Sequence, residues 1–420
     1  MSPITLAMDD QAWYQLWSSA PTLVGAAFVF AFGACVGSFL NVLCFRLPAG
    51  MSIASPPSRC GTCGRRLRWF ENLPILGWIL AGGRCRTCGD RVSAQYPLVE
   101  AATALLFAAL FLLLFAVRPG PGLGGVTNGF FHGQGFGGAW PAFAAWLTLV
   151  AGTLAAAIID ARTFLIPIQI TGFITASALA LWVVQLFLPI SHRTPPGEWA
   201  IPVAGWTGTA CGLAGCLGLG VSVLLLWARV IRPSFHDYDD FVAPGETLAA
   251  YPHARREMVR ELLFLMPCIV GVTTALLLSP RLPADLPPLW LQALAAPCLG
   301  ILVGGGLIWA IRILGSLAFG KEAMGMGDVH LMAAAGAVLG WAAPIGAFLV
   351  AIFVALGWTL AASGWAALWK RRRRELPLGP HLAVGILMVM FARPVLVEIA
   401  RLLWPLFVPE SAPGLFTNPS

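Results

Sequence analysis

The chain has 420 residues, of which 58% are hydrophobic and only 11% carry a charge. With a mean hydropathy of +0.80, this composition excludes an ordinary soluble domain and predicts an all-α polytopic membrane protein. The formal net charge of +7 could suggest a nucleic-acid partner, but in a membrane protein the placement of Lys and Arg is more informative, so we expect no nucleic acid. Asp9 and Asp10 stand where a signal peptide would be basic, so we expect the first span to be retained.

Apolar runs of roughly 17 to 25 residues are long enough to cross a bilayer, and they predict about ten transmembrane helices. The runs are 21–43, 97–117, 139–159, 165–189, 204–228, 261–280, 290–311, 331–349, 350–369 and 377–392. Most Lys and Arg residues fall in the alternate loops 44–96, 160–164, 229–260, 312–330 and 370–376. The positive-inside rule therefore predicts that these loops are cytoplasmic. One boundary stays open, because 331–349 and 350–369 could form a single bent helix, which would move the basic run Lys370–Arg374 outside.

The first span and its loop carry two local patterns. Gly33 and Gly37 predict close packing against another helix, with Asn41 as an interhelical hydrogen-bond donor or acceptor. In loop 44–96, two CxxC knuckles supply the four thiolates of a closed tetrahedral zinc site. The proposed metal ligands are Cys60, Cys63, Cys85 and Cys88. Disulfides are disfavoured in a cytoplasmic loop, and an iron–sulfur or redox role is the less favoured alternative. We therefore predict a small cytoplasmic zinc-knuckle loop domain.

These patterns divide the chain into six parts. They are a first span (1–43), a zinc loop (44–96), a bundle with Asp160 (97–231), an insertion with an extra span (232–289), a bundle with Asp328 (290–392) and an interfacial tail (393–420). The Gly-rich stretch 119–138 is expected to be a flexible connector.

Two carboxylates lie at helix ends on the predicted cytoplasmic face. Asp160 ends an apolar run, and Asp328 follows Gly325 and Gly327, which leave room for a substrate backbone to approach. Each has a structural alternative: Asp160 could pair with Arg162, and Asp328 could cap a helix that starts near Val329. Two carboxylates brought close do not both ionise easily, so one can act as an acid while the other activates water. The pair therefore favours peptide hydrolysis.

With these features in view, the chain resembles the bacterial type IV prepilin leader peptidases, membrane aspartic proteases with a GxGD motif. The resemblance extends over most of the chain and is carried by an ordered set of motifs. They are Gly37-Ser38-Phe39-Leu40-Asn41-Val42 with Arg46-Leu47-Pro48, the two knuckles, Glu71-Asn72-Leu73-Pro74, Tyr96-Pro97-Leu98-Val99-Glu100, Ile159-Asp160 with Thr163 and Pro167, Gly325-Met326-Gly327-Asp328, and Pro377-Leu378-Gly379-Pro380.

The resemblance implies that Asp160 and Asp328 are catalytic and remove the basic leader of prepilins or pseudopilins at the cytoplasmic face of the bacterial inner membrane. It also implies, for many members, methylation of the new N-terminus with S-adenosylmethionine. This chain departs from the family at His330, where Lys is common and where imidazole would titrate in the physiological range. It also departs at Ile168, in place of an acid or amide, and in the insertion 232–289.

Two other functions compete with the protease. A proton-coupled transporter could use the two aspartates as a relay, although it would need neither the zinc loop nor the GxGD glycines. A zinc-stabilised assembly platform without catalysis predicts that Asp→Asn changes are tolerated.

Overall fold

The computed structural model describes residues 10–117, 129–189, 199–202, 205–237, 252–369 and 377–407. These residues form helices, and within them the only β-type pairings are the isolated bridges Arg59–Arg66 and Arg84–Arg91. The long helices are α1 (Asp10–Arg46), α3 (Gln95–Phe111), α4 (Gly129–Thr163), α5 (Ile168–Leu186), α6 (Trp206–Trp227), α8 (Ala254–Leu278), α9 (Leu289–Phe319), α10 (Met326–Leu339), α11 (Ala342–Trp369) and α12 (Gly379–Phe407). The shorter elements are η1 (Trp69–Asn72), α2 (Leu76–Leu80), η2 (Leu112–Ala116) and η5 (Ser279–Arg281).

Within the described part of the chain, nine helices are long and apolar enough to cross a membrane, and α10 is a shorter apolar helix. Each of the ten predicted runs therefore corresponds to a helix, and the prediction of an all-α multi-pass membrane protein is confirmed. Large apolar side chains such as Phe28, Trp227 and Leu277 are exposed on the helix surfaces. Such surfaces are stable when lipid rather than water covers them.

The break between the eighth and ninth runs exists, but its predicted position was wrong. The helices separate at Gly340 and Trp341 rather than after residue 349. Gly340 has φ +82°, a conformation that side chains rarely adopt, and it ends α10. With 14 residues, α10 is about 21 Å long and shorter than the roughly 30 Å hydrocarbon core. One of its ends, the Gly340 turn or the Asp328 turn, therefore lies within the depth of the membrane.

The prediction of a flexible connector over 119–138 was wrong in its second half. Residues 129–138 lie in α4, which is kinked at Gly135 (φ +64°), whereas residues 119–128 lie outside the described residues. Phe130 and Phe131 are buried, and the Phe131 ring packs edge-on against Trp146 at a centroid distance of 5.5 Å. This aromatic burial compensates for the low helix propensity of the glycines in the segment.

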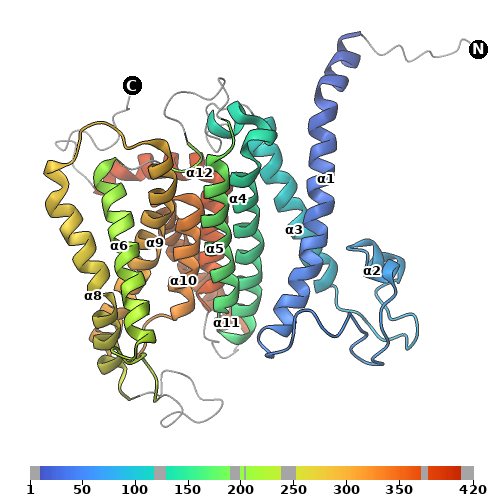
Figure 1. Ribbon diagram of the computed structural model, residues 1–420. Helices are drawn as coiled ribbons and strands as arrows, with labels where there is room; N and C mark the ends of the chain where they lie inside the picture. The colour runs from blue at the N-terminus through green and yellow to red at the C-terminus, as the bar shows by residue number, and fades with distance from the viewer. Residues whose placement is uncertain are drawn as a thin grey trace, which may run out of the picture.

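The helices form a bundle in which α1 and α3 pack together at one edge and α6 and α8 at the other (Figure 1). Helices α4, α5, α9, α10 and α12 lie between them, and the loop with α2 projects beside the lower part of α1. A Cβ at Gly33 would lie 2.8 Å from the Ala104 Cα, and one at Gly37 would lie 2.6 Å from the Glu100 Cα. The predicted close packing of the first span is thus confirmed, with α3 as the partner.

The predicted hydrogen bond of Asn41 is also present. Its side-chain Nδ2 donates to the Tyr96 carbonyl oxygen at the start of α3, at 3.1 Å. This bond and the two glycine contacts hold the lower ends of α1 and α3 together, at the point where the cysteine loop leaves one helix and enters the other.

Candidate active site and metal centre

Asp160 lies in the last turns of α4 and is only 6% exposed. One carboxylate oxygen, Oδ2, accepts a hydrogen bond from the backbone N–H of Gly379 at 2.9 Å. A Cβ at Gly379 would lie 2.6 Å from the same oxygen, so a side chain there would displace the carboxylate. The proposed pairing with Arg162 was wrong, because the Arg162 guanidinium donates to the Gln95 side chain instead. The start of α12 therefore holds Asp160 in place.

Asp328 lies in the first turn of α10 and is 8% exposed. The suggestion that it caps a helix starting near Val329 was wrong, since α10 begins at Met326 with Gly325 as its N-cap. A Cβ at Gly327 would lie 2.7 Å from the Ile166 Cβ, in the turn that follows Asp160. Gly327 thus lets α10 begin directly against the α4–α5 turn. As a result, the first turn of α10, which carries Asp328, lies against the turn that follows Asp160 at the end of α4.

The two motif glycines differ in their surroundings. Gly327 is packed against Ile166, whereas a Cβ at Gly325 would meet only ordinary contacts, with Asp328 Oδ2 at 3.6 Å as its nearest neighbour. Close packing within the protein therefore explains why position 327 is a glycine, but it does not explain the glycine at position 325. The role of Gly325 in substrate approach remains a prediction.

Sequence reasoning missed three groups around the pair. Gly379 belongs to a motif that was recognised, but nothing in the local sequence showed that its N–H would reach Asp160. His381 lies near Asp160, and its Nδ1 is 3.0 Å from the Pro377 carbonyl oxygen. Arg312 from α9 donates a hydrogen bond to the Met324 carbonyl oxygen, four residues before Asp328. Each of these groups lies many residues from the aspartates in the sequence. Local sequence patterns therefore could not predict that they are close in the structure.

His330 occupies a different place from the pair. It is half-buried, two residues after Asp328 on α10. Two residues correspond to about 200° of rotation around an α-helix, so His330 lies on roughly the opposite face from Asp328. His330, the residue that differs from the family pattern, therefore points away from the two carboxylates.

The four predicted metal ligands form one cluster. The sulfur atoms of Cys60, Cys63, Cys85 and Cys88 all lie within 4.8 Å of one another, and all four are free thiols. The distances are 3.8 Å from Cys60 to Cys88 and 4.0 Å from Cys63 to Cys85. A tetrahedral zinc with Zn–S bonds of about 2.3 Å requires sulfurs about 3.8 Å apart. The donor set and its spacing therefore fit a closed, structural tetrahedral site.

Each knuckle is built in the same way. The Cys60 N–H donates to the Arg65 carbonyl oxygen at 2.9 Å, and the Cys85 N–H donates to the Asp90 carbonyl oxygen at 2.8 Å. Arg65 also forms a two-bond ion pair with Glu71, at 3.0 and 2.8 Å. These bonds, together with the Arg68 N–H, lower the pKa of Glu71 to about 2. The ion pair connects the first knuckle to η1, so Arg65 pairs with a carboxylate as well as lying near the thiols.

A cavity of about 850 Å³ lies where the cysteine loop meets α1 and α3. Its lining includes Arg46, Glu71, Trp78, Tyr96 and Glu100. Glu100 is 7% exposed and accepts a hydrogen bond from the Ile75 N–H at 2.6 Å. The volume falls in the range of small-molecule sites, roughly 300–1,000 Å³. The cavity is thus a second candidate site, formed by other elements than the aspartate pair.

Comparison with known families gives two matches. The Bacterial Peptidase A24 N-terminal domain matches residues 31–114, and the Type IV leader peptidase family matches residues 259–360. The first range contains the cysteine cluster, and the second contains Arg312 and Asp328. No solved structure matches the chain.

Curated relatives agree with the family matches. A protein of Klebsiella pneumoniae named prepilin leader peptidase/N-methyltransferase is 33% identical over 179 residues, which cover 41% of this chain and 68% of the relative. A protein of the same name from Burkholderia pseudomallei (strain 1026b) is 26% identical over 399 residues, 88% of this chain and 86% of the relative. One from Myxococcus xanthus is 52% identical over 95 residues, 22% of this chain and 28% of the relative. With one family match over the cysteine cluster, another over Asp328, and a relative matched over two thirds of its length, the chain belongs to the type IV leader peptidase family.

Proposed function

We propose that this protein is a membrane aspartic endopeptidase that removes the leader peptide from type IV prepilins or pseudopilins. The observation that carries the proposal is the placement of Asp160 and Asp328: both are buried, and the Gly327–Ile166 contact brings the start of α10 against the turn that follows Asp160. Membership of the leader peptidase family supplies the substrate class.

The chemistry follows from the state of two neighbouring carboxylates. One is ionised and takes a proton from water while the water oxygen bonds to the scissile carbonyl carbon. The other is protonated and gives its proton to the carbonyl oxygen. The tetrahedral intermediate then collapses: the first carboxyl gives the proton it took from water to the leaving amine as the C–N bond breaks, and the second carboxylate takes back a proton from the hydroxyl oxygen as the carbonyl re-forms. The Gly379 N–H holds Asp160 in position for these steps.

The placement of the loops supports a cytoplasmic active site in the bacterial inner membrane. Asp160 at the end of α4 and Asp328 at the start of α10 lie at the end of the bundle where α1 and α6 finish and α8 begins (Figure 1). The loops at this end are the Arg-rich ones, which the positive-inside rule assigns to the cytoplasm. A basic leader that stays in the cytoplasm would reach the carboxylates from this side.

The four cysteines would hold zinc as a structural ion. With four thiolate ligands the shell is closed, so the metal would stabilise the fold of loop 47–94 rather than bind a substrate.

The first prediction tests the proteolytic function. Membranes that contain this protein are mixed with a prepilin from the same organism, and the product is analysed by intact-protein mass spectrometry. We expect a product shortened by the mass of its basic leader, with cleavage directly before the hydrophobic N-terminal helix. Membranes without the protein serve as the control. A prepilin that keeps its full mass throughout would contradict the proposal. If vesicles containing the protein took up protons and cut no prepilin, the transporter would be favoured.

The cavity beside the cysteine loop favours a second activity, methylation of the new N-terminus. The relatives are named as N-methyltransferases as well as peptidases. In this reaction the amine nitrogen bonds to the methyl carbon of S-adenosylmethionine, the S–CH₃ bond breaks, and the amine loses a proton. Glu100 is a buried carboxylate in the lining of the cavity and could accept that proton.

The second prediction concerns Glu100→Gln. Gln keeps an oxygen that can accept the Ile75 N–H, so the fold of the loop should persist. We expect transfer of labelled methyl groups to the processed pilin to fall by roughly 10²-fold, the lower range for loss of a general base, while leader removal continues. Asp285→Asn, in an exposed loop, is the control. Unchanged methylation in the Gln variant would exclude Glu100 as the proton acceptor.

A further inference from the structure

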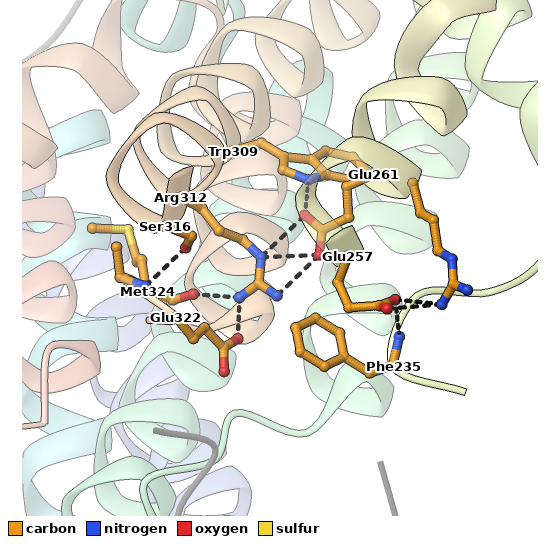
Figure 2. Close-up of polar contacts among 10 residues, drawn as sticks. Phe235, Glu257, Glu261, Trp309, Arg312, Ser316, Glu322 and Met324 are labelled. Atoms are coloured by element: carbon orange, nitrogen blue, oxygen red, sulfur yellow. Dashed lines mark hydrogen bonds and ion pairs between the residues drawn. The ribbon is translucent and has the colours of Figure 1, made fainter. Parts of the chain in front are cut away.

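Arg312 is a buried cation that has no part in the proton transfers proposed above. It lies on α9, two turns before the helix ends, and is only 2% exposed. Figure 2 shows its guanidinium between α8 and the segment that precedes the Gly325–Asp328 motif. Nε and Nη2 donate to the Glu261 carboxylate at 3.0 to 3.2 Å. Nη1 donates to the Glu322 carboxylate and to the Met324 carbonyl oxygen.

Glu261 is itself fixed in place. It is 2% exposed, and its Oε2 also accepts a hydrogen bond from the Trp309 indole N–H at 2.7 Å. Because Trp309 and Arg312 lie one turn apart on α9, the two donors hold the Glu261 carboxylate against that helix (Figure 2). The orientation of the Arg312 guanidinium is therefore set by α8.

A simple helix-to-helix ion pair would need only Glu261 and Arg312. Buried ion pairs are often replaceable by apolar side chains without loss of stability, so the pair alone does not explain its presence. What distinguishes Arg312 is its bond to Met324, a backbone carbonyl four residues before Asp328. This bond connects α8 to the backbone of the catalytic motif through one planar, rigid donor group.

A second contact holds the same segment. The Ala323 N–H donates to the Ser316 hydroxyl at 3.0 Å, so α9 binds segment 320–325 at two points. Arg255 of α8 in turn donates to the Leu317 carbonyl oxygen at 3.0 Å, near the end of α9. The turn from α9 into α10 is thus held by α9 itself and by α8 behind it.

We propose that Arg312 is a positioning residue for Asp328, and that Glu261 of α8 sets the orientation in which Arg312 holds the Met324–Asp328 backbone. This inference rests on the proposed peptidase function. It gives α8 a role in the catalytic site. Although α8 lies within the range 232–289 that the sequence suggested as an insertion, most of it falls within residues 259–360, which match the Type IV leader peptidase family. The inference also predicts that Lys cannot replace Arg312, since one ammonium group cannot bind Glu261, Glu322 and the Met324 carbonyl in the same fixed plane.

The test compares two buried glutamates on α8. Glu261→Gln removes the charge that orients Arg312, and Arg312→Lys keeps the charge but removes the planar donor. The matched control is Glu257→Gln, one turn earlier, because Glu257 is 0% exposed and bonds to Phe235, Arg256 and Arg260. Gln keeps an oxygen that can accept the Phe235 N–H, so the Phe235 ring should stay over the Arg312 guanidinium, with its centroid 5.7 Å from Cζ. For each full-length variant in detergent, kcat and KM for a prepilin and amide hydrogen exchange of residues 320–328 are measured, after size-exclusion chromatography confirms a folded protein.

We expect Glu261→Gln and Arg312→Lys to lower kcat by about tenfold or more while KM changes by less than about twofold, because misplacement of a reacting group by about 1 Å costs up to 10²-fold. Exchange of residues 320–328 should rise about tenfold in both variants, since local opening becomes easier. Glu257→Gln should leave kcat and this exchange unchanged.

Three results would overturn the inference: a wild-type kcat in both variants, an equal loss of kcat in Glu257→Gln, or faster exchange over the whole protein rather than over 320–328. Failure of the peptidase function is distinguishable, because wild-type protein would then leave prepilin uncut. In that case hydrogen exchange alone still decides whether Arg312 holds the segment.

Discussion

Replacing Asp328 by Asn is expected to lower the rate of leader removal by at least roughly 10³-fold, and replacing Asp160 by Asn is expected to do the same, within the range for loss of a general acid or base. Each amide is close in size to the carboxylate, so the buried site keeps its packing. An amide at either position can neither take a proton from water nor give one to the carbonyl oxygen. The measurement is the initial rate of prepilin cleavage in membranes with matched amounts of protein.

Asp285→Asn is the matched control for both changes, because Asp285 is an exposed aspartate in the loop between α8 and α9. It should cleave at the wild-type rate. If either Asp160→Asn or Asp328→Asn cleaves as fast as this control, the two-carboxylate mechanism is wrong, and the assembly platform without catalysis becomes the better interpretation. Glu100→Gln in the same assay shows whether the two proposed activities are separable.

Replacing Cys60 and Cys63 together by Ser is expected to remove about one zinc per chain and to unfold the cysteine loop. Structural zinc binding contributes on the order of 10 kcal/mol in small domains. Loop 47–94 buries no large apolar side chain that could replace this contribution. Metal content is measured by elemental analysis of the purified protein, and loop folding by limited proteolysis between α1 and α3. Chelation of the wild-type protein should produce the same cleavage pattern.

Cys35→Ser provides the control, since Cys35 is a free cysteine on α1 outside the cluster. It should keep its zinc and its resistance to proteolysis. A double variant with an unchanged zinc content would contradict the assignment of the four cysteines. Iron with visible absorption in the wild-type protein would instead support the iron–sulfur alternative.

The two sites differ in how far the sequence could define them. The cysteine cluster follows from two CxxC spacings, because two residues between thiols bring both sulfurs to one metal, and the structure places all four together. The aspartate pair required the loop count, which placed Asp160 and Asp328 on the same face. Their proximity depends on Gly327 packing against Ile166, a contact that no spacing rule gives.

The fold shows the same division. Apolar runs predicted ten helices because hydrocarbon favours any sufficiently long apolar helix, whatever its neighbours. The end of α10 was misplaced by about ten residues, since Gly340 and Trp341 interrupt a run whose hydropathy does not change. The Gly-rich start of α4 was misread as a connector, since its helix is stabilised by aromatic packing with distant residues.

The sequence by itself determined the membrane class, most of the apolar helices, the four cysteines that cluster and the two carboxylates that are buried, because hydropathy, ligand spacing and charge placement act locally along the chain. Only the tertiary structure decided that Gly379 holds Asp160 and that Arg312, oriented by Glu261, holds the segment before Asp328. These contacts join helices far apart in the sequence, and they depend on which helix faces pack together. Helix packing in lipid is selected by close van der Waals fit and interhelical hydrogen bonds rather than by apolar character, so composition alone does not reveal it.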